Sequence, residues 1–183
     1  MVIEINKQES DEFYKETVNI TVQAANLWKN PRYQFRNMYV RFTALLIASA
    51  VLIALLTGLA IINKPDFLII TGIVIMALVV LLNAFSLINM NAQRKSLKEG
   101  FKPKTLTFDE EFFGLLNNDG SSATKKSWDQ FVCVRVSPQT ISFIPKKSSD
   151  AIILFVSREY ENQICGWLRE NRPDVLIVTQ DKI

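Results

Sequence analysis

Two long apolar runs interrupt a chain that is otherwise rich in charged residues. The first covers residues 42–62 and the second residues 67–88, and neither contains a charged side chain. With a rise of about 1.5 Å per residue, helices of this length reach roughly 30 Å, the thickness of the hydrocarbon core of a bilayer. A helix buried in a soluble protein normally keeps a polar face, which these runs lack. The pattern therefore predicts a transmembrane helix for each run.

The two predicted spans are joined by a short polar loop, residues 63–66. Pro65 prevents one helix from continuing through the loop, so the spans are expected to form an antiparallel hairpin with both chain ends on one side. Basic residues precede the first span and follow the second, whereas the loop between the spans carries one lysine and one aspartate. The positive-inside rule then predicts a multi-pass protein of the inner (plasma) membrane with both termini in the cytoplasm.

The basic residues beside the spans also indicate what the protein binds. Those assigned to contacts with lipid headgroups are Arg32, Arg36, Arg41, Arg94, Lys95 and Lys98. The chain has a net charge of +3, and the positive charge is juxtamembrane because the segments farther from the spans are mildly acidic. This distribution favours membrane lipids as partners and argues against nucleic acid.

The polar flanks have periodicities of their own. Before the first span, a strand at residues 2–5 and a helix from about residue 10 to residue 29 are predicted. From residue 105 onward the apolar residues alternate as in strands, with turns between them. The predicted strands lie near residues 105–108, 112–116, 131–136, 141–144, 151–156 and 175–179. Ser157 is the expected N-cap of a helix that ends near residue 171.

These elements predict a membrane protein with a two-helix transmembrane hairpin and an α+β cytosolic domain. In that domain, antiparallel strands are closed by a C-terminal helix, as in a pleckstrin-homology (PH)-like fold. The predicted divisions are a cytosolic and juxtamembrane segment, two spans and the PH-like domain, at residues 1–41, 42–62, 67–88 and 105–183. About eighty residues are near the lower limit for independent folding, so the anchor or the N-terminal segment is expected to add stability.

Three short motifs carry a resemblance to a known family. Residues 107–111 read Thr-Phe-Asp-Glu-Glu, residues 127–131 read Ser-Trp-Asp-Gln-Phe, and residues 144–147 read Ile-Pro-Lys-Lys. Together with the hairpin before them, these motifs resemble the bacterial YcxB-like family, with the Pro-Lys-Lys motif one strand earlier than in the family pattern. The resemblance implies a small PH-like cytoplasmic domain and no catalytic residues.

Residues with catalytic or metal-binding chemistry are scarce. The chain contains no histidine, so a general base near neutral pH would have to be a carboxylate, lysine or cysteine with a shifted pKa. Cys133 and Cys165 lack metal-ligand spacing and are expected to be reduced, buried thiols. The sequence has no nucleophile elbow and no phosphate-binding glycine loop. We therefore expect a protein that is not an enzyme and uses no cofactor or metal.

The remaining candidate residues concern partners and helix packing. Trp128, Lys146 and Lys147 are candidates for a partner surface, although a tryptophan in such a segment more often belongs to a core. The helix-packing candidates are Ala50, Ala54 and Gly58 in the first span and Asn83 in the second. Small residues at this spacing allow close approach of another helix, either the second span or a span of a second copy.

The favoured function is a non-enzymatic, membrane-tethered interaction module. It holds the PH-like domain at the inner leaflet, where the domain binds anionic lipid or an unknown protein, including another copy of the chain. The alternative is an immunity or self-protection protein against a membrane-active toxin, for which a neighbouring toxin gene would be the evidence. A transport subunit ranks last, because the spans contain few polar residues and no ionisable one.

Cysteine labelling in intact cells tests the predicted orientation. A cysteine in place of Asn63 should react with a membrane-impermeant thiol reagent, because the loop is expected outside. A cysteine in place of Asp181 should react only after the cells are permeabilised. The parent chain, labelled in parallel, gives the background from the native thiols. The reverse pattern would exclude cytoplasmic termini.

Overall fold

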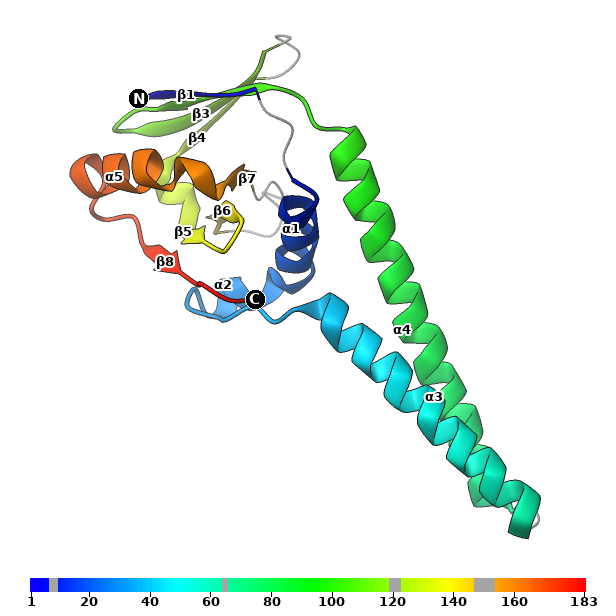
Figure 1. The fold of residues 1–183 in the computed structure, drawn as a ribbon. Helices are drawn as coiled ribbons and strands as arrows, with labels where there is room; N and C mark the ends of the chain where they lie inside the picture. The colour runs from blue at the N-terminus through cyan, green and yellow to red at the C-terminus, as the bar shows by residue number, and fades with distance from the viewer. Residues whose placement is uncertain (7–9, 64–65, 119–122, 147–153) are drawn as a thin grey trace. The chain divides into compact units, whose positions relative to one another are not determined.

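The computed structural model describes residues 1–6, 10–63, 66–118, 123–146 and 154–183 (Figure 1). The chain divides into two compact units. The first consists of Met1–Phe35 together with Arg94–Ile183, and the second of Arg36–Gln93. The first unit is thus assembled from sequence on both sides of the second.

The second unit is made of two long helices. These are α3 (Met38–Asn63) and α4 (Phe67–Glu99), with the last residues of α4 belonging to the first unit. Within the described residues, both helices are long and apolar enough to cross a membrane. Only 6% of the most apolar window of each is buried, which is unlike the core helix of a soluble protein. Two long apolar helices are thus confirmed, and their insertion into a bilayer stays a prediction.

The two helices pack through small and polar side chains. A Cβ atom added at Gly72 of α4 would lie 3.2 Å from Cδ1 of Leu56 in α3, so the glycine permits a close approach. Ser49 and Asn83 are buried in the same unit. Asn83 Nδ2 donates to the carbonyl oxygen of Val79 at 2.7 Å, so its amide is bonded within its own helix.

One sheet of the first unit joins the N-terminal residues to the segment after α4. Its order is β1 (Val2–Ile5), β2 (Lys104–Phe108), β3 (Phe112–Asn117) and β4 (Ala123–Ser127), with every pair antiparallel. Exposed and buried residues alternate along β1, so Ile3 and Ile5 point into the core. The predicted strand at residues 2–5 is confirmed, and β2 is its partner.

The other sheet has a parallel edge. Its order is β7 (Leu154–Ser157), β6 (Thr140–Pro145), β5 (Phe131–Val136) and β8 (Ile177–Thr179), with β8 parallel to β5. Residues of β5 and β6 are buried on both faces, which explains their nearly continuous apolar runs. The expected antiparallel strands are present, but they divide between two sheets to which each chain end adds a strand, and β8 differs from the expectation because it is parallel to β5.

Helices flank both sheets in the first unit. They are α1 (Asp11–Gln23), α2 (Ala25–Lys29) and α5 (Glu161–Asn171), with 3-10 turns η1 (Trp128–Gln130) and η3 (Arg158–Tyr160). Ser10 caps α1, because the Phe13 amide donates to its hydroxyl at 3.2 Å. The predicted cap at Ser157 is wrong. Its side chain makes no capping hydrogen bond, because η3 follows it and α5 begins only at Glu161.

Aromatic rings form the centre of the core in the first unit. Phe113 stacks on Phe143 with ring centroids 4.9 Å apart, and Phe108 stacks on Trp128 at 5.9 Å. Trp128 is 2% exposed, and its indole nitrogen donates to the carbonyl oxygen of Asp109 at 2.7 Å. The buried face of α5 packs against the same cluster. The C-terminal helix therefore closes a core to which both sheets contribute.

Replacing Trp128 by alanine removes the largest fully buried side chain of this core. The change is expected to lower the free energy of unfolding by about 3–5 kcal/mol, because it leaves a cavity among the rings. Denaturant unfolding of the full chain in detergent, followed by circular dichroism, measures the effect. Leu116→Ala is the control, since Leu116 is 43% exposed and its loss should cost less than about 1 kcal/mol. Equal losses in the two variants would contradict the central place of Trp128.

Candidate functional site

The cations that follow the apolar part of α4 are engaged within the first unit. Arg94 Nη1 lies 3.5 Å and Lys98 Nζ 3.9 Å from the carboxylate of Asp11, in the first turn of α1. Lys95 Nζ lies 3.8 Å from the carboxylate of Glu99, one helical turn later. Exposed ion pairs of this kind contribute only about 0–1 kcal/mol. These predicted headgroup ligands are therefore partly neutralised by acidic residues of the same chain.

The cations that precede α3 are arranged differently. Arg32 is exposed in the first unit, and Arg36 and Arg41 are exposed in the second. The backbone amide of Arg32 donates to Oδ1 of Asn30 at 3.0 Å, which fixes the turn after α2. The backbone of Arg32 is therefore held in a defined turn, and the residue is exposed at the surface.

Trp28 connects this segment to the end of β6. Its indole nitrogen donates to the carbonyl oxygen of Pro145 at 2.8 Å, and the ring is half-buried. Lys29 and Lys146, each next in sequence to one of these two residues, are both exposed. We call Trp28, Lys29, Arg32 and Lys146 the Trp28 surface. Arg32 and Lys146 are separate features of the sequence, whereas the fold brings their segments together.

The Trp28 surface differs from the α4 end in its charge balance. Among the described residues, no carboxylate lies within ion-pair distance of Lys29, Arg32 or Lys146. Lys147, the fourth cation of this part of the sequence, lies outside the described residues. The three described cations are therefore available to an anionic partner.

Trp128 does not belong to an exposed partner surface. The ring is buried between Phe108 and Phe131 and is one of the central residues of the core. Its prediction as a partner contact is wrong, because a side chain that is 2% exposed cannot reach a partner. The alternative interpretation of this residue, as part of the core, is the one that the structure supports.

The predicted helix-packing residues fall on two different faces. Asn83 is buried in the second unit, and its amide is bonded within α4. Ala50 and Ala54 are exposed, and no atom lies within 4 Å of a Cβ built at Gly58. The small-residue face of α3 is therefore not the face that packs on α4. Gly72, which was not among the predicted residues, allows the close approach instead.

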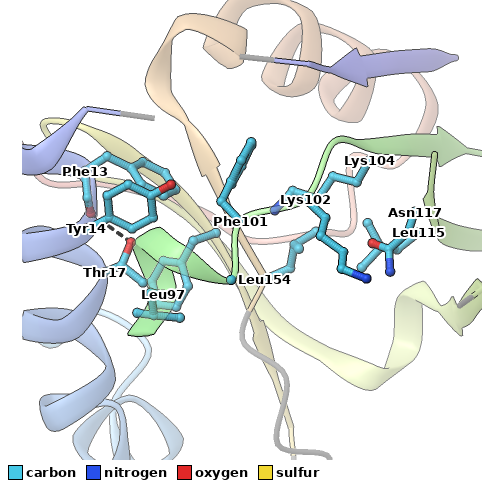
Figure 2. Close-up of a pocket in the computed structure, with 12 residues that line it drawn as sticks. Phe13, Tyr14, Thr17, Leu97, Phe101, Lys102, Lys104, Leu115, Asn117 and Leu154 are labelled. Atoms are coloured by element: carbon cyan, nitrogen blue, oxygen red, sulfur yellow. Dashed lines mark hydrogen bonds between the residues drawn. The ribbon is translucent and has the colours of Figure 1, made fainter. Parts of the chain in front are cut away.

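A pocket of about 290 Å³ opens in the first unit (Figure 2). Its walls come from α1, from the end of α4 and the following linker, and from β3 and β7. The lining residues are Phe13, Tyr14, Thr17, Leu97, Gly100, Phe101, Lys102, Lys104, Leu115, Asn117, Leu154 and Phe155. No single segment of the sequence signals this pocket, because four separate parts of the chain meet there.

The pocket is apolar at one end and cationic at the other (Figure 2). At the apolar end, the hydroxyl of Thr17 donates to the carbonyl oxygen of Phe13 at 2.8 Å, so this polar group is bonded within α1. At the other end, Lys104 pairs with Asn117 across β2 and β3, and its Nζ lies 5.5 Å from the ring centroid of Phe101. The pairing of β2 with β3 therefore sets a cation and an amide side by side.

A buried carboxylate fixes α1 to the second sheet. Glu16 accepts hydrogen bonds from the Gln139 amide at 3.0 Å and from the Thr140 hydroxyl at 2.7 Å. Burial raises the pKa of the Glu16 carboxyl, against these two hydrogen bonds, which lower it. The position of α1, and with it one wall of the pocket, depends on this contact.

A buried arginine ties the C-terminal segment to the residues before α3. Arg135 is fully buried, its guanidinium lies 4.4 Å from the ring centroid of Phe35, and it donates to the side-chain oxygen of Gln180. Gln180 also accepts from the Phe35 amide at 3.0 Å and donates to the Phe35 carbonyl oxygen at 2.9 Å. Burial lowers the pKa of Arg135. A single arginine within the apolar strand at residues 131–136 was the sequence signal for this network.

The two thiols of the first unit are buried and protonated. Cys133 is fully buried, and burial raises its pKa to about 11. Burial likewise raises the pKa of Cys165. Both thiols are therefore protonated near neutral pH and poorly nucleophilic. Within the part of the chain that the structure describes, no cluster of three potential ligands is placed to hold a metal ion.

No protein-family model, curated protein or solved structure matches the chain. The resemblance to the YcxB-like family therefore stays a prediction from the sequence, and the function has to be argued from the arrangement of the residues.

The contact made by Glu16 predicts a pH dependence of stability. Because the folded chain binds this proton more tightly than the unfolded chain, the carboxyl stabilises the fold most below its ordinary pKa of 4.5. That contribution is lost as the pH rises through the raised pKa. The stability of the parent chain relative to Glu16→Gln, which keeps an acceptor oxygen, should therefore fall as the pH rises above 4.5.

Denaturant midpoints of both chains across this pH range provide the measurement. Glu170→Gln is the matched control, because Glu170 is exposed on α5 and its removal should leave the relative stability nearly constant. If the stability of the parent chain relative to Glu16→Gln rose with pH, the fold would favour the ionised carboxylate instead.

Proposed function

We propose that the chain is a non-enzymatic, membrane-tethered binding module. The two apolar helices cross the inner (plasma) membrane as a hairpin and hold a PH-like unit at the cytoplasmic face. There the unit binds anionic lipid headgroups or a protein partner. The observation that carries the proposal is the composition of the first unit, which is one compact body made from both flanks of the apolar helices.

The pairing of these flanks supports a common side for both chain ends. All four residues of β1 pair with β2, so residues before α3 and after α4 share one sheet. Gln180 and Phe35 exchange two hydrogen bonds across the same division of the sequence. A polar body of this kind cannot be split by a bilayer, so the two helices have to enter and leave from one face. The basic residues on both flanks make the cytoplasmic face the preferred one.

The two sheets and α5 support a PH-like unit. The first unit has two four-stranded sheets whose buried faces share one core with the C-terminal helix. A C-terminal helix that closes a core of β-strands is the feature that the sequence resemblance implies. In this unit, the surface loops and strand ends are the places where a partner can bind.

The Trp28 surface supports contact with lipid. Arg32 lies six positions before Met38, where α3 begins, so the chain keeps it within about 20 Å of the helix start. Tryptophan favours the headgroup region, where its ring is buried and its N–H is bonded. Each lysine or arginine close to an anionic leaflet contributes about 1 kcal/mol of attraction. Three uncompensated cations beside a tryptophan therefore suit an anionic leaflet.

Native mass spectrometry of the full chain in nanodiscs of mixed anionic and zwitterionic lipid tests this function. Neutralising Lys29, Arg32 and Lys146 to glutamine should weaken retention of anionic lipid roughly a hundredfold, at about 1 kcal/mol for each charge. The matched control removes the same charge from Lys125, Lys126 and Arg169, which lie on β4 and α5. Equal losses in the two triple variants would show that net charge, and not this surface, selects the lipid.

A further inference from the structure

We infer that the outer edge of β8 is a docking site for an extended, acidic segment of a partner protein, which adds a strand beside Ile177–Thr179. The inference rests on the proposed function, because it gives the protein partner of the module a site and a chemistry. The site shares no residue with the pocket beside α1 and shares only Arg32 with the Trp28 surface.

β8 is an edge strand with backbone groups directed away from its sheet. It is last in the strand order, and among the described strands its one neighbour is β5 (Figure 1). Backbone groups of Leu176 and Gln180 bond to β5 at 2.9 Å and 2.8 Å. Because the direction of these groups alternates along a strand, residues 177 and 179 direct theirs away from β5. An added strand can pair with them.

The sequence of β8 leaves this edge unprotected. Edge strands are commonly blocked by charged side chains, especially lysine, or by proline. β4, an edge strand of the other sheet, carries Lys125 and Lys126. β8 reads Ile-Val-Thr, and Leu176 before it is 37% exposed. An extended chain can therefore approach β8 without meeting a charge on the strand itself.

A groove of about 670 Å³ runs along this edge. Residues 176–182 line it without a break, together with Arg32, Gln34 and Arg135. None of the described lining residues comes from β6 or β7, so the groove lies beside β8 and away from the middle of the sheet. Its volume is within the range of about 300–1,000 Å³ that is usual for ligand sites. The groove therefore suits a short extended segment.

The charge of the groove favours an acidic segment. Arg32 and Lys182 are exposed, and no described carboxylate lies within ion-pair distance of either. Asp181, the one acidic residue among the described lining residues, lies 3.5 Å from Nη2 of Arg158. Arg135 is fully buried, and its Nε has no hydrogen-bond partner among the described residues. A carboxylate would therefore be attracted to the groove, whereas a second copy docked through the same edge would bring like charges together.

Binding of dye-labelled synthetic peptides to the full chain in zwitterionic nanodiscs tests the inference. The probe is a short peptide in which valine and glutamate alternate, and its counterpart has lysine in place of glutamate. Zwitterionic lipid leaves Arg32 without a competing anionic headgroup, and empty nanodiscs give the background. Saturable binding of the glutamate peptide is expected. The lysine peptide should bind at least about tenfold more weakly, as expected for the loss of a charged hydrogen bond.

Methylation of the peptide amides separates strand addition from attraction of charge alone. A strand pairs through alternate residues on each of its sides. Methyl groups on one alternating set of amides should therefore weaken binding at least about tenfold, as loss of charge does, whereas methyl groups on the other set should be tolerated. The two methylated peptides have the same charge, so equal affinities would contradict strand addition.

Two double variants test the position of the site. Arg32→Gln/Lys182→Gln should weaken binding of the glutamate peptide at least about tenfold. Lys125→Gln/Arg169→Gln is the matched control, because it removes the same charges from β4 and α5 and should leave the affinity unchanged.

The assignment would be overturned by the absence of saturable binding, by equal binding of the lysine peptide, or by equal losses in the two double variants. Failure of the proposed function would appear instead in the cysteine labelling and in the retention of anionic lipid, neither of which involves a peptide.

Discussion

The pairing of β1 with β2 is the contact on which the rest of the first unit depends. It pairs Ile3 with Leu106, although both apolar helices lie between these two residues in the sequence. Both side chains are buried in the core. Hydrogen bonds of a sheet are made only when both strands are present, so neither flank can complete this sheet alone. The two helices between the flanks are therefore constrained to return the chain to its starting side.

The two hydrogen bonds between Phe35 and Gln180 form a second link between the flanks. They explain why the residues beyond position 105 do not form the unit alone. Arg135 is a fully buried cation. It donates a hydrogen bond to the side-chain oxygen of Gln180, and its guanidinium lies over the face of the Phe35 ring. A buried charge without such partners is strongly destabilising. The segment before α3 therefore compensates a charge that the second sheet carries, and it contributes more than a linker does.

The sequence predicts the local elements of this fold and little of their pairing. The apolar helices and the strand at residues 131–136 follow from continuous runs, which have a clear length and period. Pairing joins positions far apart in the chain, and nothing in the residues 2–5 identifies β2 as their partner. The parallel edge at β8 and the convergence of four segments at the pocket were unpredictable for the same reason. The Trp28 surface depends on one hydrogen bond, to a backbone carbonyl that no side-chain pattern reveals.

The two basic flanks, similar in sequence, take different roles once the chain has folded. Arg94 and Lys98 face Asp11 and help to hold the first turn of α1, whose aromatic residue Phe13 lines the pocket. Lys29 and Arg32 face no described carboxylate and stay at the surface. An anionic surface that drew Arg94 away from Asp11 would act on α1, whereas one that bound Lys29 would leave the fold unchanged. On the proposed arrangement, contact of the first flank with lipid therefore leaves the fold intact, whereas contact of the second flank competes with the ion pairs that hold α1.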